Sequence, residues 1–355
     1  MMNKKWIALL IVTGGVVGFL AVVLTVLGNP ANMGVCVACF LRDTAGALGL
    51  HSAAPVQYIR PEILGFILGA FILSLGRREW KPEGGSSPLV RFFISLFVMI
   101  GALVFLGCPL RMVLRLAGGD LNALGGLAGF VSGIALGAFM LKKGFSLGRA
   151  YEQSAASGLL MPAAALALLA FLLIKPAFIK LSEAGPGSMH APLLASLAVG
   201  LVIGGLAQLS RMCMSGGFRD LILIKNPSML LVYAAIFATA LAANLAAGKF
   251  NAGFSGQPIA HSDFLWNFLG MALAGYGSTL LGGCPLRQTI MAGQGSADGA
   301  ICVLGLLAGA AISHNFGLAA SPAGVPVNGQ IACVIGLAVL TVIALLNIKG
   351  NTAAA

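Results

Sequence analysis

The sequence predicts an all-α, polytopic membrane protein, and three observations lead to this fold class. Hydrophobic residues make up 59% of the 355 positions and charged residues only 9%, whereas about a quarter of the residues in a soluble domain are charged. Apolar runs of roughly twenty residues, the length that crosses a bilayer as a helix, recur along the whole chain. The two halves of the chain also share motifs. These observations exclude a soluble enzyme, and the chain is expected to be surrounded by the lipid bilayer.

About ten transmembrane helices are expected from the apolar runs. Lys4 and Lys5 precede the first run, which is too long for the core of a signal peptide, so we expect it to be retained as a helix. The expected spans are 6–28, 59–76, 90–107, 122–141, 158–174, 191–210, 228–247, 263–282, 298–316 and 329–348.

Basic residues in the expected loops predict the orientation, because cytoplasmic loops carry an excess of Lys and Arg. With a cytoplasmic N-terminus, the basic residues of the inside loops are Lys4, Lys5, Arg77, Arg78, Lys81, Arg91, Lys142, Lys143, Arg149, Lys225 and Lys349. Those of the outside loops are Arg60, Lys175, Lys180 and Lys249. We therefore expect a multi-pass protein of the cell inner (cytoplasmic) membrane with both termini in the cytoplasm. The net charge of +11 belongs to these loops and indicates no nucleic-acid partner.

The second half of the chain repeats motifs of the first. An identical Gly-Cys-Pro-Leu-Arg motif occurs at 107–111 and at 283–287. An upstream cysteine and an Arg-Asp pair recur at nearly the same offset, and these residues are Cys36, Arg42, Asp43, Cys213, Arg219 and Asp220. We divide one integral membrane domain into a first transmembrane repeat, 1–180, and a second, 181–355. Each holds five expected spans, so the second enters the membrane from the opposite side, and such inverted repeats bind substrate near the midplane where they meet.

Four apolar segments are too broken to span the membrane, and each lies between two full spans. They are 33–49, 108–118, 211–224 and 284–295. Each contains arginine, which is costly at membrane depth unless it faces protein or a wet cavity. Irregular backbone is tolerated there only where it is buried or lines a path. We therefore expect four re-entrant half-helices, the first two entering from outside and the second two from the cytoplasm, with four cysteines approaching the centre.

The Gly-Cys-Pro-Leu-Arg motif predicts a cysteine at the start of a half-helix. Proline is favoured in the first helical turn, where its missing N–H is not needed, so Cys108 and Cys284 are expected at N-caps. A helix N-terminus offers free N–H groups and partial positive charge to an anion. The supporting residues are Gly107, Pro109, Arg111, Gly283, Pro285 and Arg287. The combination suits a small, soft, sulfur- or selenium-rich anion that the arginines attract, and the alternative is a tight turn holding a small apolar cysteine.

The upstream cysteines, Cys36 and Cys213, are expected in the same path, and packing at a helix crossing is their other explanation. Cys39 forms a Cys-x-x-Cys with Cys36, a spacing found in redox pairs and in half of a zinc site. Its equivalent in the second half is Gly216, so this pair is not part of the repeat. No second Cys-x-x-Cys or histidine cluster accompanies it, so we expect no metal and no cofactor. The Arg-Asp pairs are expected to cap or anchor half-helices.

The doubled motif and the upstream cysteine segments resemble the YeeE/YedE family of bacterial sulfur-compound permeases over nearly the whole chain. The stretch 33–43, Met-Gly-Val-Cys-Val-Ala-Cys-Phe-Leu-Arg-Asp, is similar to the YedE branch, which is associated with selenium metabolism. The resemblance implies that thiosulfate-like anions pass through an hourglass-shaped path by S–H···S hydrogen bonds. The conduit cysteines would be Cys36, Cys108 and Cys284, with Cys213 completing the symmetry. The family also implies a separate SirA/TusA-like cytoplasmic sulfur carrier as a partner.

The sequence therefore predicts an inner-membrane permease and not an enzyme. Its expected cargo is a small selenium- or sulfur-containing species, with selenium favoured by the family branch, imported through a cysteine-lined central path. A thiosulfate importer is the alternative within transport. A membrane thiol oxidoreductase that uses Cys36 and Cys39, and a non-transporting scaffold for a sulfur carrier, are alternatives from other classes. No Gly-x-x-x-x-Gly-Lys-Ser/Thr phosphate loop is present, so ATP hydrolysis by that route is excluded.

Overall fold

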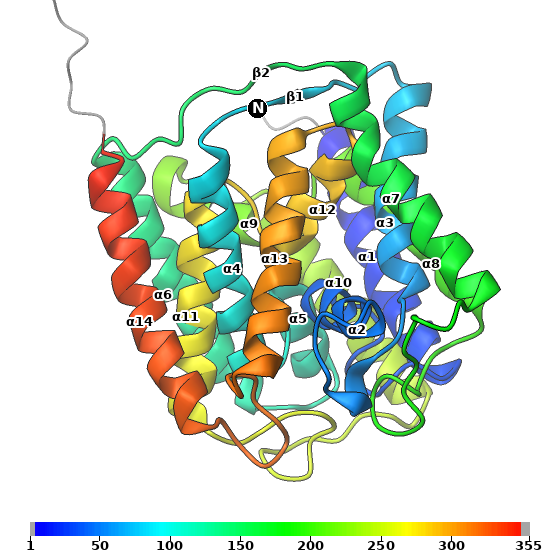
Figure 1. Cartoon of the computed structure of the whole chain (residues 1–355). Coiled ribbons are helices and arrows are strands. Elements are labelled where there is room, and N and C mark those ends of the chain that lie inside the picture. The colour runs from blue at the N-terminus through cyan, green and yellow to red at the C-terminus, as the bar shows by residue number, and fades with distance from the viewer. Residues whose placement is uncertain (1–3, 349–355) are drawn as a thin grey trace, which may run out of the picture.

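Ten long helices form the bundle in the part of the chain that the computed structural model describes, residues 4–348 (Figure 1). Each helix overlaps one of the expected spans. They are α1 (Lys4–Val26), α3 (Pro61–Gly76), α4 (Pro88–Phe105), α6 (Asn122–Lys142), α7 (Ala155–Ile174), α8 (Leu193–Ser210), α10 (Leu230–Ala246), α11 (Phe264–Leu280), α13 (Ala297–Asn315) and α14 (Val327–Leu346). Lys349, which the charge count includes, lies outside the described residues.

Four short helices lie between the long ones, where half-helices were expected. They are α2 (Val37–Ala47), α5 (Pro109–Ala117), α9 (Met214–Ile224) and α12 (Pro285–Gly293). The remaining elements are a single 3₁₀ turn, η1 (Ala54–Val56), and the antiparallel two-residue strands β1 (Glu83–Gly84) and β2 (Tyr151–Glu152). The all-α prediction is therefore confirmed.

Nine helical stretches among residues 4–348 are long and apolar enough to cross a membrane. Three of them join a long helix to the short helix that follows it: Pro88–Ala117, Leu193–Ile224 and Phe264–Gly293. The apolar helix α10 is shorter, with 17 residues, so it extends only about 26 Å at 1.5 Å per residue. That length is at the lower limit for a membrane span. The chain is a multi-pass membrane protein, as predicted.

Long helices from the two halves of the chain pack in matching pairs. α3 packs against α8, and the equivalent pair is α10 with α1. α6 packs against α11, and the equivalent pair is α13 with α4. A Cβ atom at Gly129 or Gly133 of α6 would collide with the backbone of α11, and one at Gly305 or Gly309 of α13 with the backbone of α4. Small residues of this kind let membrane helices approach closely. The order of long and short helices is also the same in α1–α7 and α8–α14, although the boundary between 180 and 181 stays a prediction.

The first long helix begins and the last one ends at the same end of the bundle. α1 starts and α14 finishes at the end that holds β1 and β2, at the top of Figure 1, which we call the β end. The backbone N–H of Ser146, just after α6, donates to the carbonyl of Asn347 there at 3.2 Å. The loop 175–192 between α7 and α8 lies at the opposite end, which we call the far end.

Candidate functional site

Each of the four short helices begins directly after a cysteine. Cys36, Cys108, Cys213 and Cys284 are the N-caps of α2, α5, α9 and α12, respectively, and all four have an extended backbone. For Cys108 and Cys284, this is the position that the following proline predicts. Cys36 and Cys213 take the same position without a proline after them.

The cysteine sulfurs make two kinds of contact at these helix starts. Cys36 Sγ accepts a hydrogen bond from the N–H of Cys39, and Cys213 Sγ accepts one from the N–H of Gly216, each at 3.3 Å. These two thiols therefore cap their own helices. Cys284 Sγ instead accepts from the N–H of Met214, the first residue of α9, at 3.3 Å.

The four thiols form two pairs, one from each half of the chain. Cys36 lies within hydrogen-bonding reach of Cys108, and Cys213 lies within reach of Cys284. All four are buried, with exposed fractions of 0%, 1%, 8% and 1% in chain order. The pairing brings α2 next to α5 and α9 next to α12, although two long helices lie between the members of each pair in the sequence.

Tyr233 of α10 is a neighbour of both pairs, and sequence reasoning missed it. Its ring hydroxyl is close enough to Cys108, Cys213 and Cys284 to interact with them electrostatically. The same hydroxyl donates a hydrogen bond to the carbonyl of Met214 at the start of α9. A lone tyrosine in an apolar span carries no motif, so only its place in the fold reveals it.

The short helices run toward opposite ends of the bundle. α2 and α5 lie in the lower half of Figure 1 and α9 and α12 in the upper half. After α5, the carbonyl of Gly118 accepts from the N–H of Asn251 in the loop after α10, at 2.9 Å. After α12, the carbonyl of Gln294 accepts from the N–H of Lys81 beside β1, at 3.0 Å. The cysteine ends of the four helices consequently point inward from both sides.

The first motif arginine, Arg111, is fully buried and bonds three separate segments of backbone. Its Nε donates to the carbonyl of Asn32 at 2.9 Å, its Nη2 to that of Ile259 at 3.1 Å, and its Nη1 to that of Leu106. Nη1 also lies 3.5 Å from Cys39 Sγ. We expected this guanidinium to attract an anion beside the motif cysteine. Its donors are instead used by carbonyls and by the Cys39 thiol.

The second motif arginine, Arg287, has different surroundings. Its Nη1 is buried and has no hydrogen-bond partner among the described residues. The side chain lines a cavity of about 300 Å³ at the β end, together with Arg211, which ends α8. This guanidinium therefore remains available to a ligand.

The first Arg-Asp pair belongs to a buried network. Asp43 Oδ1 accepts from Arg42 Nη2 at 2.7 Å, and Asp43 Oδ2 accepts from Arg60 Nε at 2.8 Å. Arg60 also donates to the carbonyls of Met189 at 3.0 Å and Pro186 at 2.6 Å. Arg60, counted above among the outside loops, is thus the fully buried N-cap of α3. This network fits the anchoring role expected of the pair.

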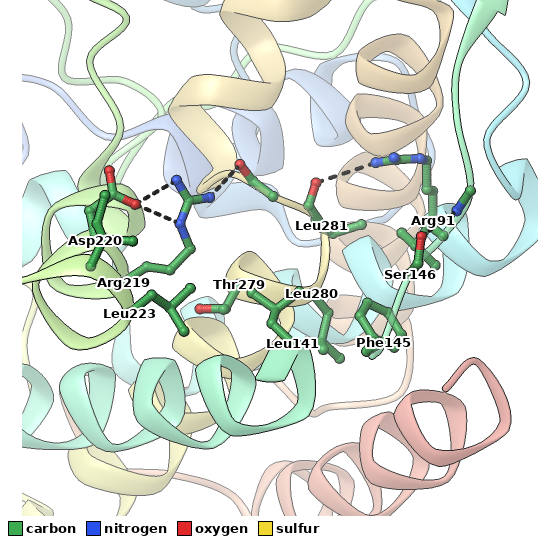
Figure 2. A pocket seen from close by; sticks show the side chains of 14 residues that line it. Arg91, Leu141, Phe145, Ser146, Arg219, Asp220, Leu223, Thr279, Leu280 and Leu281 are labelled. Atoms are coloured by element: carbon green, nitrogen blue, oxygen red, sulfur yellow. Dashed lines mark hydrogen bonds and ion pairs between the residues drawn. The ribbon is translucent and has the colours of Figure 1, made fainter. Parts of the chain in front are cut away.

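The second Arg-Asp pair is only half-buried and lines a cavity (Figure 2). Arg219 Nη2 lies 2.8 Å from Asp220 Oδ1, and Arg219 Nη1 donates to the carbonyl of Gly282 at 3.4 Å. The cavity has a volume of about 470 Å³. Arg91 borders it from α4 and donates to the carbonyl of Leu281 at 3.3 Å.

Comparison with protein families gives a match in the second half of the chain. Residues 209–354 match the model of a family described as sulphur transport. The match supports the resemblance to the YeeE/YedE family. The matched segment begins near the end of α8 and contains Cys213, Cys284 and Arg287. It therefore includes the second cysteine pair and the unpartnered arginine.

A curated protein is similar over a shorter stretch. The thiosulfate transporter TsuA of Escherichia coli (strain K12) is 30% identical over 107 residues. The alignment spans 30% of this chain and 30% of the length of that transporter. The family description and the name of this relative both refer to the transport of sulfur compounds.

Proposed function

We propose that this chain is an inner-membrane permease that imports a small sulfur- or selenium-containing anion past its four central cysteines. One observation carries the proposal: four buried cysteines start four half-helices that point inward from both ends of the bundle. Helix N-termini present N–H groups and partial positive charge to an anion. A thiol adds a weak donor and a weak acceptor, which suit a soft anion.

The proposed path runs from Cys36 and Cys108 to Cys213 and Cys284. The anion moves from one pair to the next by exchanging hydrogen bonds, so no covalent bond to sulfur is needed. The motif glycines support this geometry, because a Cβ atom at Gly107 or Gly283 would crowd the side chain of the motif arginine in the same half. The motif prolines, Pro109 and Pro285, occupy the first turn of their helices.

Two inverted repeats, 1–180 and 181–355, are the proposed framework of this path. The matching helix order and the matching pairs of packed helices in the two halves support it. In transporters built in this way, the substrate site lies where the repeats meet. The excess of Lys and Arg at the β end supports a cytoplasmic position for that end and for both termini.

The sulfur chemistry of the cargo is better supported than selenium. The family described as sulphur transport and the similarity to a thiosulfate transporter both favour a sulfur compound, so the thiosulfate importer is the better supported of the two. A separate SirA/TusA-like carrier is the proposed partner at the β end. It would bind where the anion leaves the second cysteine pair.

Uptake by proteoliposomes tests the proposal. Purified full-length protein is reconstituted, and uptake of radiolabelled thiosulfate and of radiolabelled selenite is measured for wild type, Cys108→Ala and Cys284→Ala. We expect either cysteine variant to lower uptake about tenfold or more, since each removes a group that contacts the moving anion. The preferred label identifies the cargo.

Cys302→Ala is the matched control, because Cys302 is a buried cysteine of α13 outside the four half-helices. It should transport like wild type. Equal uptake by wild type and both motif variants would overturn the cysteine path. Absence of uptake by folded wild-type protein would overturn autonomous transport.

A membrane thiol oxidoreductase is the second candidate, and one contact favours it. Arg111 Nη1 lies 3.5 Å from Cys39 Sγ, and the Cys39 N–H donates to Cys36 Sγ. A guanidinium beside a thiol stabilises the thiolate that exchange chemistry requires. Cys39→Ser separates the two functions: it should leave uptake within about threefold of wild type in a permease, whereas it abolishes the activity of an exchanging pair.

A further inference from the structure

A cavity at the β end is lined by two arginines that are close in sequence to the second cysteine pair. Its volume is about 300 Å³, and Arg287 and Arg211 line it. Arg287 is in the first turn of α12, three residues after Cys284, and Arg211 precedes Cys213 by two residues. Arg287 is close enough to Arg211 and to both thiols to interact with them electrostatically. Two arginines of the cavity lining therefore lie near the second cysteine pair.

Both arginines have unused donors. Within residues 4–348, the side chains of Arg211 and Arg287 form no hydrogen bond or ion pair. Arg287 Nη1 is in addition buried. Guanidinium groups bind oxyanions through several parallel N–H donors, so an unpaired and partly buried guanidinium favours anion binding.

The carboxylates that border the cavity are already engaged. Glu79 pairs with Arg77 at 3.0 Å and accepts from Gln208 Nε2 at 3.0 Å. Glu83 lies 3.7 Å from Lys81. Two positive charges, those of the arginines, consequently remain uncompensated in the cavity. A dianion would balance them.

The two motif arginines, Arg111 and Arg287, do not share one structural role. Arg111 is buried and donates to three carbonyls, whereas Arg287 donates to none. Arg211 corresponds to Gly34 in the first half, so the second arginine is also absent there. Among residues 4–348, this pair of free guanidiniums on the β side therefore has no counterpart at the equivalent positions of the first half.

We propose that Arg211 and Arg287 form a binding site for a small tetrahedral dianion of the sulfur-oxyanion class, on the β side of Cys213 and Cys284. The inference rests on the proposed permease function and extends it. The site holds the anion after it leaves the second thiol pair and keeps it within reach of a cytoplasmic acceptor. Because charge and shape are recognised, sulfate and thiosulfate bind alike, whereas passage from the far end to the site requires the thiols.

Equilibrium binding to the purified full-length protein tests the site. Calorimetric titrations with sodium thiosulfate and with sodium sulfate at low ionic strength are made on wild type, Arg287→Gln and Arg211→Gln. We expect each variant to bind either anion about tenfold more weakly, because one charge-assisted contact is lost. Arg287→Lys should recover part of the affinity, and added chloride should weaken wild-type binding by screening.

Arg149→Gln is the matched control, because Arg149 is an exposed arginine outside the cavity. It should bind like wild type. Equal dissociation constants for wild type and both cavity variants overturn the proposal, and so does a wild type that binds neither anion.

Cys284→Ala separates failure of the site from failure of the permease. The proposed site predicts that this variant binds anions within about threefold of wild type while it loses uptake. If Cys284→Ala loses uptake but the arginine variants bind anions like wild type, the proposed anion site is wrong and the permease function stands. If the arginine variants lose anion binding but Cys284→Ala takes up substrate normally, the cysteine path is wrong and the anion site stands.

Discussion

The two Gly-Cys-Pro-Leu-Arg motifs have the same five residues and different surroundings. Both start a nine-residue helix with a cysteine N-cap. Arg111 of the first motif is enclosed by carbonyls, whereas Arg287 of the second borders a cavity and has a buried unpaired N–H group. Local sequence therefore determines the start of the helix, and neighbouring segments determine what the arginine does.

The Arg-Asp pairs show the same difference between the halves. Arg42 and Asp43 are buried with a second arginine, whereas Arg219 and Asp220 are about a quarter exposed. Half-helix charges are thus enclosed on the far side and border cavities on the β side. The comparison indicates that the far side is stabilised by its charges and that the β side keeps its charges accessible.

The largest expected change in the free energy of unfolding is that of Asp43→Ala, and Asp220→Ala is its counterpart in the second half. Asp43→Ala leaves two buried arginines without their carboxylate, and breaking a buried pair in this way costs about 3–5 kcal/mol. Asp220→Ala breaks a partly exposed pair and should cost below about 1 kcal/mol. Denaturation of the detergent-solubilised variants measures both values. Equal losses would show that the enclosure of the first pair has no energetic consequence.

The next largest effect distinguishes the two motif arginines. Arg111→Gln leaves buried carbonyls unsatisfied and should lower the free energy of unfolding by about 3 kcal/mol. Arg287→Gln removes no hydrogen bond and should change it by less than about 0.5 kcal/mol. Thermal unfolding midpoints of the two variants compare these effects directly. A larger loss in Arg287→Gln would contradict the assignment of roles.

A smaller loss of stability is expected at the glycines where long helices of the two halves pack in equivalent pairs. Gly133→Ala and Gly309→Ala each place a Cβ atom against the backbone of the neighbouring helix. Overpacking of this kind costs about 1–3 kcal/mol, and the matching helix pairs predict similar losses. Gly76→Ala is the control, because no atom lies within 4 Å of its added Cβ. Losses that differ widely between the two variants would argue against equivalent packing.

The smallest effect is a pH dependence shared by His51 and His261. Burial lowers the pKa of both imidazoles, and each Nδ1 accepts a backbone N–H at 3.3 Å, so the neutral form faces the carbonyl of Arg42 or of Val104. A lowered pKa in the folded state means that stability is complete above the unfolded pKa, about 6.5, and decreases as the pH falls below it.

The loss for each histidine is at most about 1.4 kcal/mol per pH unit. Unfolding curves at pH values of about 7.5 and 5.5 measure it, and His51→Gln should reduce the difference. An identical difference in wild type and His51→Gln would exclude a contribution from His51.

The sequence by itself determined the helices and where the half-helices start. Apolar length predicted the ten long helices, because crossing a bilayer requires a fixed number of residues. Proline predicted the N-cap positions of Cys108 and Cys284, because its ring fixes φ at a value that suits the first helical turn. These signals depend on residues a few positions apart, so one sequence is enough to recognise them.

Only the tertiary structure decided which charges are enclosed and which groups meet at the cysteines. The acceptors of Arg111 come from Asn32 and Ile259, which are 79 and 148 positions away. Arg115 and Asp120 form a fully buried ion pair of 2.6 Å. Tyr233 reaches the cysteine pairs from α10 in the same way. Contacts of this range depend on how the helices pack, and identical motifs therefore differ in burial, charge balance and access to a ligand.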